Sequence, residues 1–126
     1  MTNLEQQRAY RAFQKTGEIS AGDKKDFLGL AQRLPAMLQN NGLLATWAFL
    51  LTKNEGVFPK MLDVLKNHLR EMGFENEVTD NAPKAIFQNW TDPHMGLNGT
   101  KLMQLTAESI AFSGWMKRAA EAICEV

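Results

Sequence analysis

The segment from Leu43 to Lys53 constrains the fold of this chain more than any other. Apolar residues would surround almost the whole circumference of a helix formed by it; they are Leu43, Leu44, Ala45, Trp47, Ala48, Phe49, Leu50 and Leu51. A helix that is apolar on every side belongs at the centre of a helical bundle. Asn40-Asn41-Gly42 supplies a break or cap before it. We therefore expect a central helix here.

The last predicted helix, Lys101–Glu125, shows a single apolar stripe instead. The members of this stripe recur at alternating steps of three and four: Leu102, Leu105, Ser109, Phe112, Met116, Ala119 and Ile123. Such spacing predicts one packing seam along the helix. The two most apolar stretches of the chain, Leu34–Lys53 and Leu105–Ala122, both carry basic residues at or near their C-terminal ends. These residues are Lys53 in the first stretch, and Lys117 and Arg118 in the second.

The rest of the chain also has helical spacing, and no alternating β-branched run of strand length interrupts it. Further helices are predicted at Thr2–Thr16, from a cap at Gly22 or Asp23 to about Leu34, at Phe58–Met72 and at Pro83–Trp90. Pro35 either kinks the second of these or starts a new helix, and Gly73 ends the third. Phe74–Asn81 is predicted to be a solvated connection and Asp92–Thr100 a loop.

These patterns predict an all-α protein, with a single compact bundle of five to six helices over one domain, 1–126. The length suits one domain, and 44% hydrophobic with 22% charged residues is ordinary for a globular chain. The longest apolar run, Leu43–Leu51, is far below the ~20 residues that span a bilayer. No signal peptide opens the chain, so we expect a cytoplasmic protein.

No catalytic or metal-binding pattern is visible, so we expect neither an enzyme nor a cofactor. His68 and His94 have no second ligand or base at helical spacing, and Cys124 is a single thiol. No glycine-rich phosphate loop or nucleophile elbow occurs. Asp23 and Asp26 are better explained by a helix cap and a solvated surface than by a carboxylate pair.

Basic residues form one ridge on the first helix. Arg8, Arg11 and Lys15 follow one another at steps of three and four, opposite Tyr10 and Phe13. One interpretation is an ordinary solvated face, and the other is a strip that follows a phosphate backbone. Because the formal net charge is zero, an anionic partner would have to be met by such a local patch.

The aromatic residues favour core packing over base stacking. Trp47, Phe49, Phe112 and Trp115 all lie in the apolar helices. Trp90 is the exception, because it lies beside a loop that we expect to be exposed.

The two apolar helices resemble those of the small all-helical subunit of type III-B CRISPR (Cmr) effector complexes. The first shows a glycine-leucine entry to an apolar helix that closes on lysine, and the second a Thr-Glu-Trp-Lys-Arg pattern. The residues that carry the resemblance are Asn41, Gly42, Leu43, Thr46, Phe49, Leu50 and Lys53, then Thr106, Glu108, Trp115, Lys117 and Arg118. Length and helix order agree as well.

The resemblance implies a non-catalytic structural subunit in antiviral defence. Such subunits stack as a minor filament along guide RNA paired with target RNA, beside the backbone and large subunits of the complex. The candidate RNA-binding residues are Arg8, Arg11, Lys15, Lys24, Lys25, Lys53, Lys117 and Arg118. They would contact the phosphate backbone, since base pairing reads the target sequence. The alternative is a helical protein-protein adaptor without nucleic-acid contact.

Overall fold

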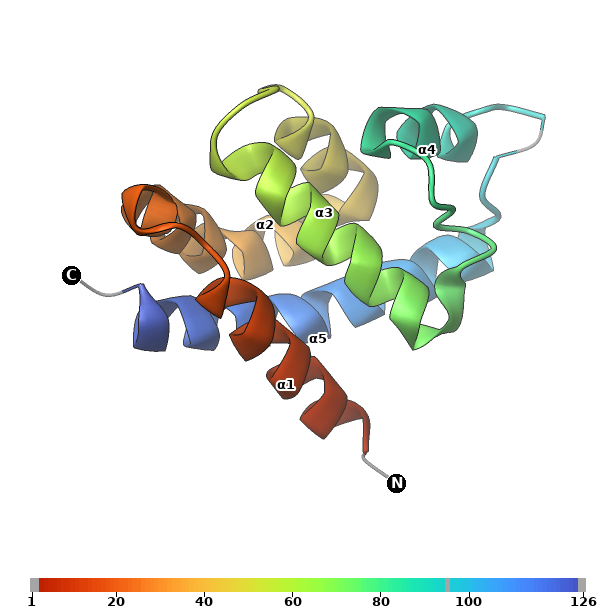
Figure 1. The fold of residues 1–126 in the computed structure, drawn as a ribbon. Coiled ribbons are helices and arrows are strands. Elements are labelled where there is room, and N and C mark those ends of the chain that lie inside the picture. Colours follow the sequence, from red (N-terminus) through yellow and green to blue (C-terminus); the bar gives the residue numbers. More distant parts are fainter. Residues whose placement is uncertain (1–2, 95, 125–126) are drawn as a thin grey trace.

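The structure, a computed structural model, describes residues 3–94 and 96–124. This part of the chain contains helices and turns but no β-strand: α1 (Leu4–Gly17), the 3₁₀ turn η1 (Ala21–Asp23), α2 (Lys24–Leu50), α3 (Val57–Leu69), the π turn η2 (Arg70–Phe74), α4 (Pro83–Trp90) and α5 (Gly99–Ile123) (Figure 1). The all-α prediction of five to six helices is confirmed. The predicted helix ends at Thr2 and Glu125 lie outside the described residues. Among the described helices, none combines the length and the apolar character needed to cross a bilayer.

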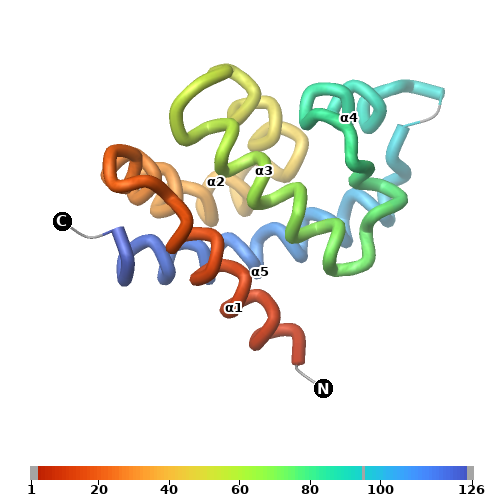
Figure 2. Tube along the Cα trace, viewed as in Figure 1, coloured from red at the N-terminus to blue at the C-terminus, as the bar shows by residue number. Residues whose placement is uncertain are grey.

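Helix α5 is the element against which most of the fold is built. Both α1 and α2 pack along it, and these are the two most extensive helix pairs. Helix α3 lies on α2 and also reaches α1 and α5, while α4 packs against α2 and α3 at the far end from the C-terminus (Figure 2). The largest side chains between these helices are completely or almost completely buried: Phe27, Leu34, Leu38, Trp47, Met61, Leu65 and Phe112.

The break before the most apolar segment lies where it was predicted. Helix α2 continues past Pro35, so that proline lies inside one helix rather than starting another. The helical backbone is then interrupted at Gly42, which has φ 84° and ψ 173°. This region of backbone space is open essentially to glycine alone. The two parts of α2 therefore meet at Gly42.

The segment after Gly42 is two-faced, so the prediction of burial on every side is wrong. Leu43, Trp47 and Leu50 are buried, but Ala45 is exposed and Phe49 is half-buried. Neighbouring helices cover only part of its circumference. Its inner face does anchor the far end of the molecule, because the Trp47 indole donates a hydrogen bond of 3.0 Å to the carbonyl oxygen of Pro83 in α4.

We expect Gly42→Ala to lower the free energy of unfolding by about 2 kcal/mol, because alanine is strained in this backbone conformation. Gly29→Ala is a matched control: Gly29 is an exposed residue with ordinary helical geometry, and a new Cβ at either position meets no atom within 4 Å. The control should raise the free energy of unfolding by about 0.5 to 1 kcal/mol. Urea unfolding followed by circular dichroism measures both, and equal effects would contradict the backbone argument.

The seam predicted along the last helix is confirmed. Leu105, Ser109, Phe112, Met116 and Ala119 of α5 are all fully or almost fully buried. The buried Ser109 hydroxyl donates to the Leu105 carbonyl oxygen at 2.7 Å, so this polar residue is satisfied within its own helix. One face of α5 can therefore pack against α1, α2 and α3 together.

The predicted short helix is found as α4, but Trp90 at its end is not exposed. Only 4% of Trp90 is accessible, and its ring centroid lies 4.8 Å from that of Trp47. Its indole donates to the Glu77 carbonyl oxygen at 2.8 Å, and Val78 beside that carbonyl is fully buried. The expected solvated connection at Phe74–Asn81 is thus partly held in the core.

Candidate functional site

Helix α1 turns its arginines toward the protein and its aromatic residues toward solvent. The side chains of Arg8 and Arg11 are 15% and 13% exposed, whereas Tyr10 is 68% and Phe13 39% exposed. Both interpretations of the basic ridge required exposed arginines. The structure corrects this point, since the ridge lies against α5 and α3.

Small residues allow this orientation of α1. Ala12 and Thr16 are fully buried and follow Arg8 at steps of four, so these residues share one face of the helix. Their short side chains let the α1 backbone approach α5 closely. Lys15 lies at the edge of that face and pairs with Glu18 at 3.7 Å.

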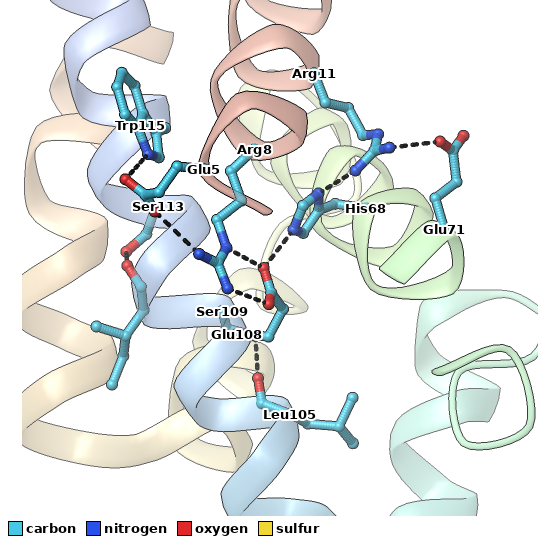
Figure 3. Close-up of polar contacts among 11 residues, drawn as sticks. Glu5, Arg8, Arg11, His68, Glu71, Leu105, Glu108, Ser109, Ser113 and Trp115 are labelled. Atoms are coloured by element: carbon cyan, nitrogen blue, oxygen red, sulfur yellow. Dashed lines mark hydrogen bonds and ion pairs between the residues drawn. The ribbon is translucent and has the colours of Figure 1, made fainter. Parts of the chain in front are cut away.

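Glu108 of α5 is the partner that holds Arg8. The Arg8 Nε and Nη2 groups donate to the two carboxylate oxygens of Glu108 at 2.8 and 2.7 Å (Figure 3). This two-point geometry is the strongest arrangement for an arginine and a carboxylate. Arg8 also reaches Glu5, one turn earlier on α1, at 3.0 Å. The ion pair with Glu108 joins residues one hundred positions apart, so it fixes α1 on α5.

His68 of α3 completes the cluster. It is fully buried, its Nε2 lies 2.8 Å from the Glu108 carboxylate, and its Nδ1 lies 2.8 Å from Nη1 of Arg11 (Figure 3). Its ring stacks on Phe112 of α5 at a centroid distance of 3.7 Å. Arg11 in turn pairs with Glu71 of η2 at 2.9 Å. A buried polar cluster therefore ties together α1, α3, η2 and α5.

The charges in this cluster shift one another's pKa values. Burial alone would raise the pKa of Glu108, but the hydrogen bonds from Arg8 and His68 outweigh it and lower the pKa to about 2. The hydrogen bond to Glu108 raises the pKa of Arg8. Burial lowers the pKa of His68, and Glu108 opposes this effect only in part. At neutral pH, the carboxylate is therefore ionised and the imidazole neutral.

This cluster joins helices from distant parts of the chain. His68 is fully buried and Glu108 is 8% exposed, so both lie among the helices that they join. Within the part of the chain that the structure describes, no three His, Cys, Asp or Glu side chains are placed to hold a metal ion. The cluster explains how Arg8 and Arg11 are used, and both are committed to internal partners.

Five further candidates are exposed or half-buried and differ from Arg8 and Arg11 in their ion pairing. No ion pair to another described residue is made by any of these five: Lys24, Lys25, Lys53, Lys117 and Arg118. Lys24 opens α2 near Cys124, which follows α5, and its charge acts on that thiol. The start of α2 and the end of α5 are thus neighbours, so four of the five cations lie toward one end of the molecule (Figure 1).

Lys53 lies apart from those four, on an open hollow of about 400 Å³ between α2 and the start of α3. Arg33, which the sequence did not mark as a candidate, lines the same hollow. Their cationic groups lie over phenylalanine rings, at 5.9 Å for Arg33 and 5.0 Å for Lys53. Asp26 and Glu55 also line it, so the charges balance and the hollow by itself does not favour an anion.

Comparison with known proteins gives the family. The sequence model of the CRISPR-associated protein family Cas_Cmr5 matches residues 4–123. The chain belongs to the Cmr5 family. This family supplies a subunit of type III-B CRISPR (Cmr) complexes, so the resemblance of the two apolar helices is confirmed.

A solved structure shares the fold of this Cmr5-family chain. The X-ray crystal structure of a CRISPR-associated Cmr5 family protein from Thermus thermophilus matches it with a TM-score of 0.76. The match covers 98% of this chain and 100% of that chain at 20% sequence identity. At that identity the likeness shows the fold alone. No curated protein matches the sequence.

Proposed function

We propose that this Cmr5-family chain is a non-catalytic structural subunit that stacks as a minor filament along the paired guide and target RNA. The observation that carries the proposal is the set of cations at the neighbouring ends of α2 and α5 that pair with no described carboxylate, in a chain whose family belongs to an RNA-guided complex. Phosphate contacts position a protein on nucleic acid without reading its sequence. That role suits cations at an accessible surface.

The geometry favours Lys24, Lys25, Lys117 and Arg118 as phosphate contacts over Arg8 and Arg11. A phosphate would have to compete with the carboxylates that already bind those two arginines. Arg118 lies with its guanidinium 4.9 Å from the centroid of the Trp115 ring, an arrangement that orients the side chain at the surface. Lys15 and Lys53 remain secondary candidates, because Lys15 pairs with Glu18 and Lys53 lines a hollow that also holds acidic residues.

A net charge of zero explains why the chain would act only within an assembly. A few surface cations on one copy attract a duplex weakly, and the attraction is screened over about 8 to 10 Å at physiological salt. Aligned copies would place several such groups along the same backbone. Binding then becomes multivalent, and affinity rises without any new kind of contact.

Charge reversal tests the proposed contacts in a reconstituted complex. We expect Lys25→Glu with Lys117→Glu to weaken RNA binding at least tenfold and to flatten its salt dependence by about one unit of log–log slope for each lysine. Lys84→Glu with Lys101→Glu is the matched control, because these lysines lie on α4 and at the start of α5. Filter binding at several salt concentrations measures both. Equal losses in the two variants, or none in the first, would contradict the proposal.

One observation favours the alternative, a protein-protein adaptor without nucleic-acid contact. The outward face of α1 carries exposed Tyr10 and Phe13, which is typical of a surface that meets another protein. Purification separates the two functions. A subunit on RNA co-purifies with a discrete guide RNA, whereas an adaptor assembly contains none.

A further inference from the structure

His68 is a buried imidazole whose two nitrogen atoms both face charged groups. Nδ1 faces Nη1 of Arg11, and Nε2 faces a carboxylate oxygen of Glu108, each at 2.8 Å. A guanidinium can only donate, so Nδ1 must accept and carries no proton. A carboxylate can only accept, so Nε2 must carry the proton. One neutral tautomer alone satisfies both partners.

A proton taken up by His68 would therefore enter at one place. The only free site on the ring is Nδ1, the atom that accepts the hydrogen bond from Arg11. After protonation two N–H donors and two positive charges would face each other at 2.8 Å, so that contact cannot persist. The contact with Glu108 becomes a full ion pair and persists. Protonation is thus directed at the link to α1 and spares the link to α5.

The helices packed around His68 differ in how their charged groups affect its protonation. Helix α5 presents Glu108, which favours the charged ring, and α1 presents Arg8 and Arg11, which oppose it. Among the described residues no charged side chain of α2 makes a hydrogen bond or ion pair with His68. The ring is fully buried, and burial also opposes the charge. Burial and the two arginines together outweigh Glu108, so the pKa of His68 lies below its ordinary value.

Arg11 has a second partner, Glu71, that can keep it paired when its contact with His68 breaks. Its Nη2 already pairs with Glu71 at 2.9 Å, and the Glu71 side chain is 62% exposed. The guanidinium can swing outward with that carboxylate and keep its counter-charge. Arg8 stays bound to Glu108, because its two hydrogen bonds to that carboxylate do not involve Nδ1 of His68.

We propose that His68 is a proton-sensitive catch between α3 and α1. In its neutral form it holds Arg11, and with it the middle of α1, against α3. On protonation it releases Arg11 to solvent together with Glu71, while Arg8 keeps α1 on α5. The device is independent of the proposed RNA contacts, because it rests only on the buried cluster.

Nuclear magnetic resonance of the ¹⁵N-labelled full chain tests the catch. His94→Gln in all samples leaves His68 as the only histidine in the chain. At pH 7.5 we expect Nδ1 to give the signal of an unprotonated ring nitrogen. As the pH falls below about 6.5, the ordinary value for histidine, we expect the Arg11 Nε–H signal to shift with the same midpoint as Nδ1 protonation. The Arg8 Nε–H signal should persist through that midpoint and remain protected from exchange with water, because Arg8 keeps both bonds to Glu108.

His68→Gln is the matched variant, since its amide can donate to Glu108 and accept from Arg11 but cannot titrate. The Arg11 signal should then stay constant over the same pH range. The proposal is overturned if Nδ1 is protonated at pH 7.5, or if the Arg11 signal does not respond to Nδ1 protonation. It is equally overturned if the Arg8 and Arg11 signals disappear together, which would mean unfolding. The measurements on the chain that retains His68 decide this alone, even where the glutamine variant fails to fold.

Discussion

Replacing Glu108 with glutamine is expected to lower the free energy of unfolding by about 4 kcal/mol. Glu108 accepts hydrogen bonds from both Arg8 and His68 and is itself only 8% exposed. An amide of the same shape removes the negative charge and places an N–H₂ group against a donor. Breaking one partner of a buried ion pair typically costs about 3 to 5 kcal/mol, because it leaves the other charge uncompensated. Urea unfolding of the two proteins at pH 7.5 measures the loss.

Glu5→Gln is the matched control for this result. Glu5 binds the same arginine at 3.0 Å, but its side chain is 62% exposed. Exposed ion pairs contribute at most about 1 kcal/mol, so this variant should remain close to the wild type. If the two variants differ by less than about 1 kcal/mol, the cluster does not hold α1 as we describe.

Acid should remove the same stabilisation without any mutation. The pKa of Glu108 is lowered from 4.5 to about 2, so the unfolded chain binds a proton at a higher pH than the folded chain does. The stabilisation is complete above about pH 4.5 and is lost as the pH falls toward 2, with a total of about 3 kcal/mol. The pKa of His68 is also lowered, so its contribution declines in the same direction, as the pH falls below about 6.5.

The pH effect is isolated by comparing the wild type with Glu108→Gln at each pH. Other carboxylates titrate in both proteins and cancel in the difference. We expect the gap in unfolding free energy between the two proteins to shrink by about 2 kcal/mol between about pH 4.5 and pH 3, as measured by urea unfolding. A gap that is constant over this range would show that Glu108 titrates alike in the folded and unfolded chains.

The helices were predictable because their signals are local. Steps of three and four along Lys101–Glu125 placed the seam of α5, and Pro83 placed the first turn of α4. Gly42 placed the break in α2, since few other residues permit that backbone conformation. Each of these signals depends on neighbours within one or two turns of the chain.

The orientation of α1 was not predictable from α1 itself. By the usual pattern Tyr10 and Phe13 should face the core and Arg8 should face solvent. The opposite holds because the partner helices offer charges at buried positions. One signal was present elsewhere in the chain: Glu108 follows Leu105 by three residues and precedes Phe112 by four, so it lies on the apolar stripe of α5. A carboxylate at such a position requires a cationic partner.

His68 of α3 is a second polar residue on a buried stripe whose partners lie far away in the sequence. It follows Leu65 by three residues and Met61 by seven, which places it on the buried stripe of that helix. Its partners are 40 and 57 residues away, so no spacing rule could find them. A second group at helical spacing is not what His68 uses, because helices from distant parts of the chain supply its partners.

Local patterns in the chain predict its helical character, the approximate ends of most of its helices and its family. Those properties depend on backbone preferences and on apolar periodicity, which act over short stretches. In contrast, the packing of the helices determines which basic residues are bound inside the molecule and which remain at its surface. That division depends on whether a carboxylate lies within hydrogen-bond distance, and folding alone brings such distant groups together.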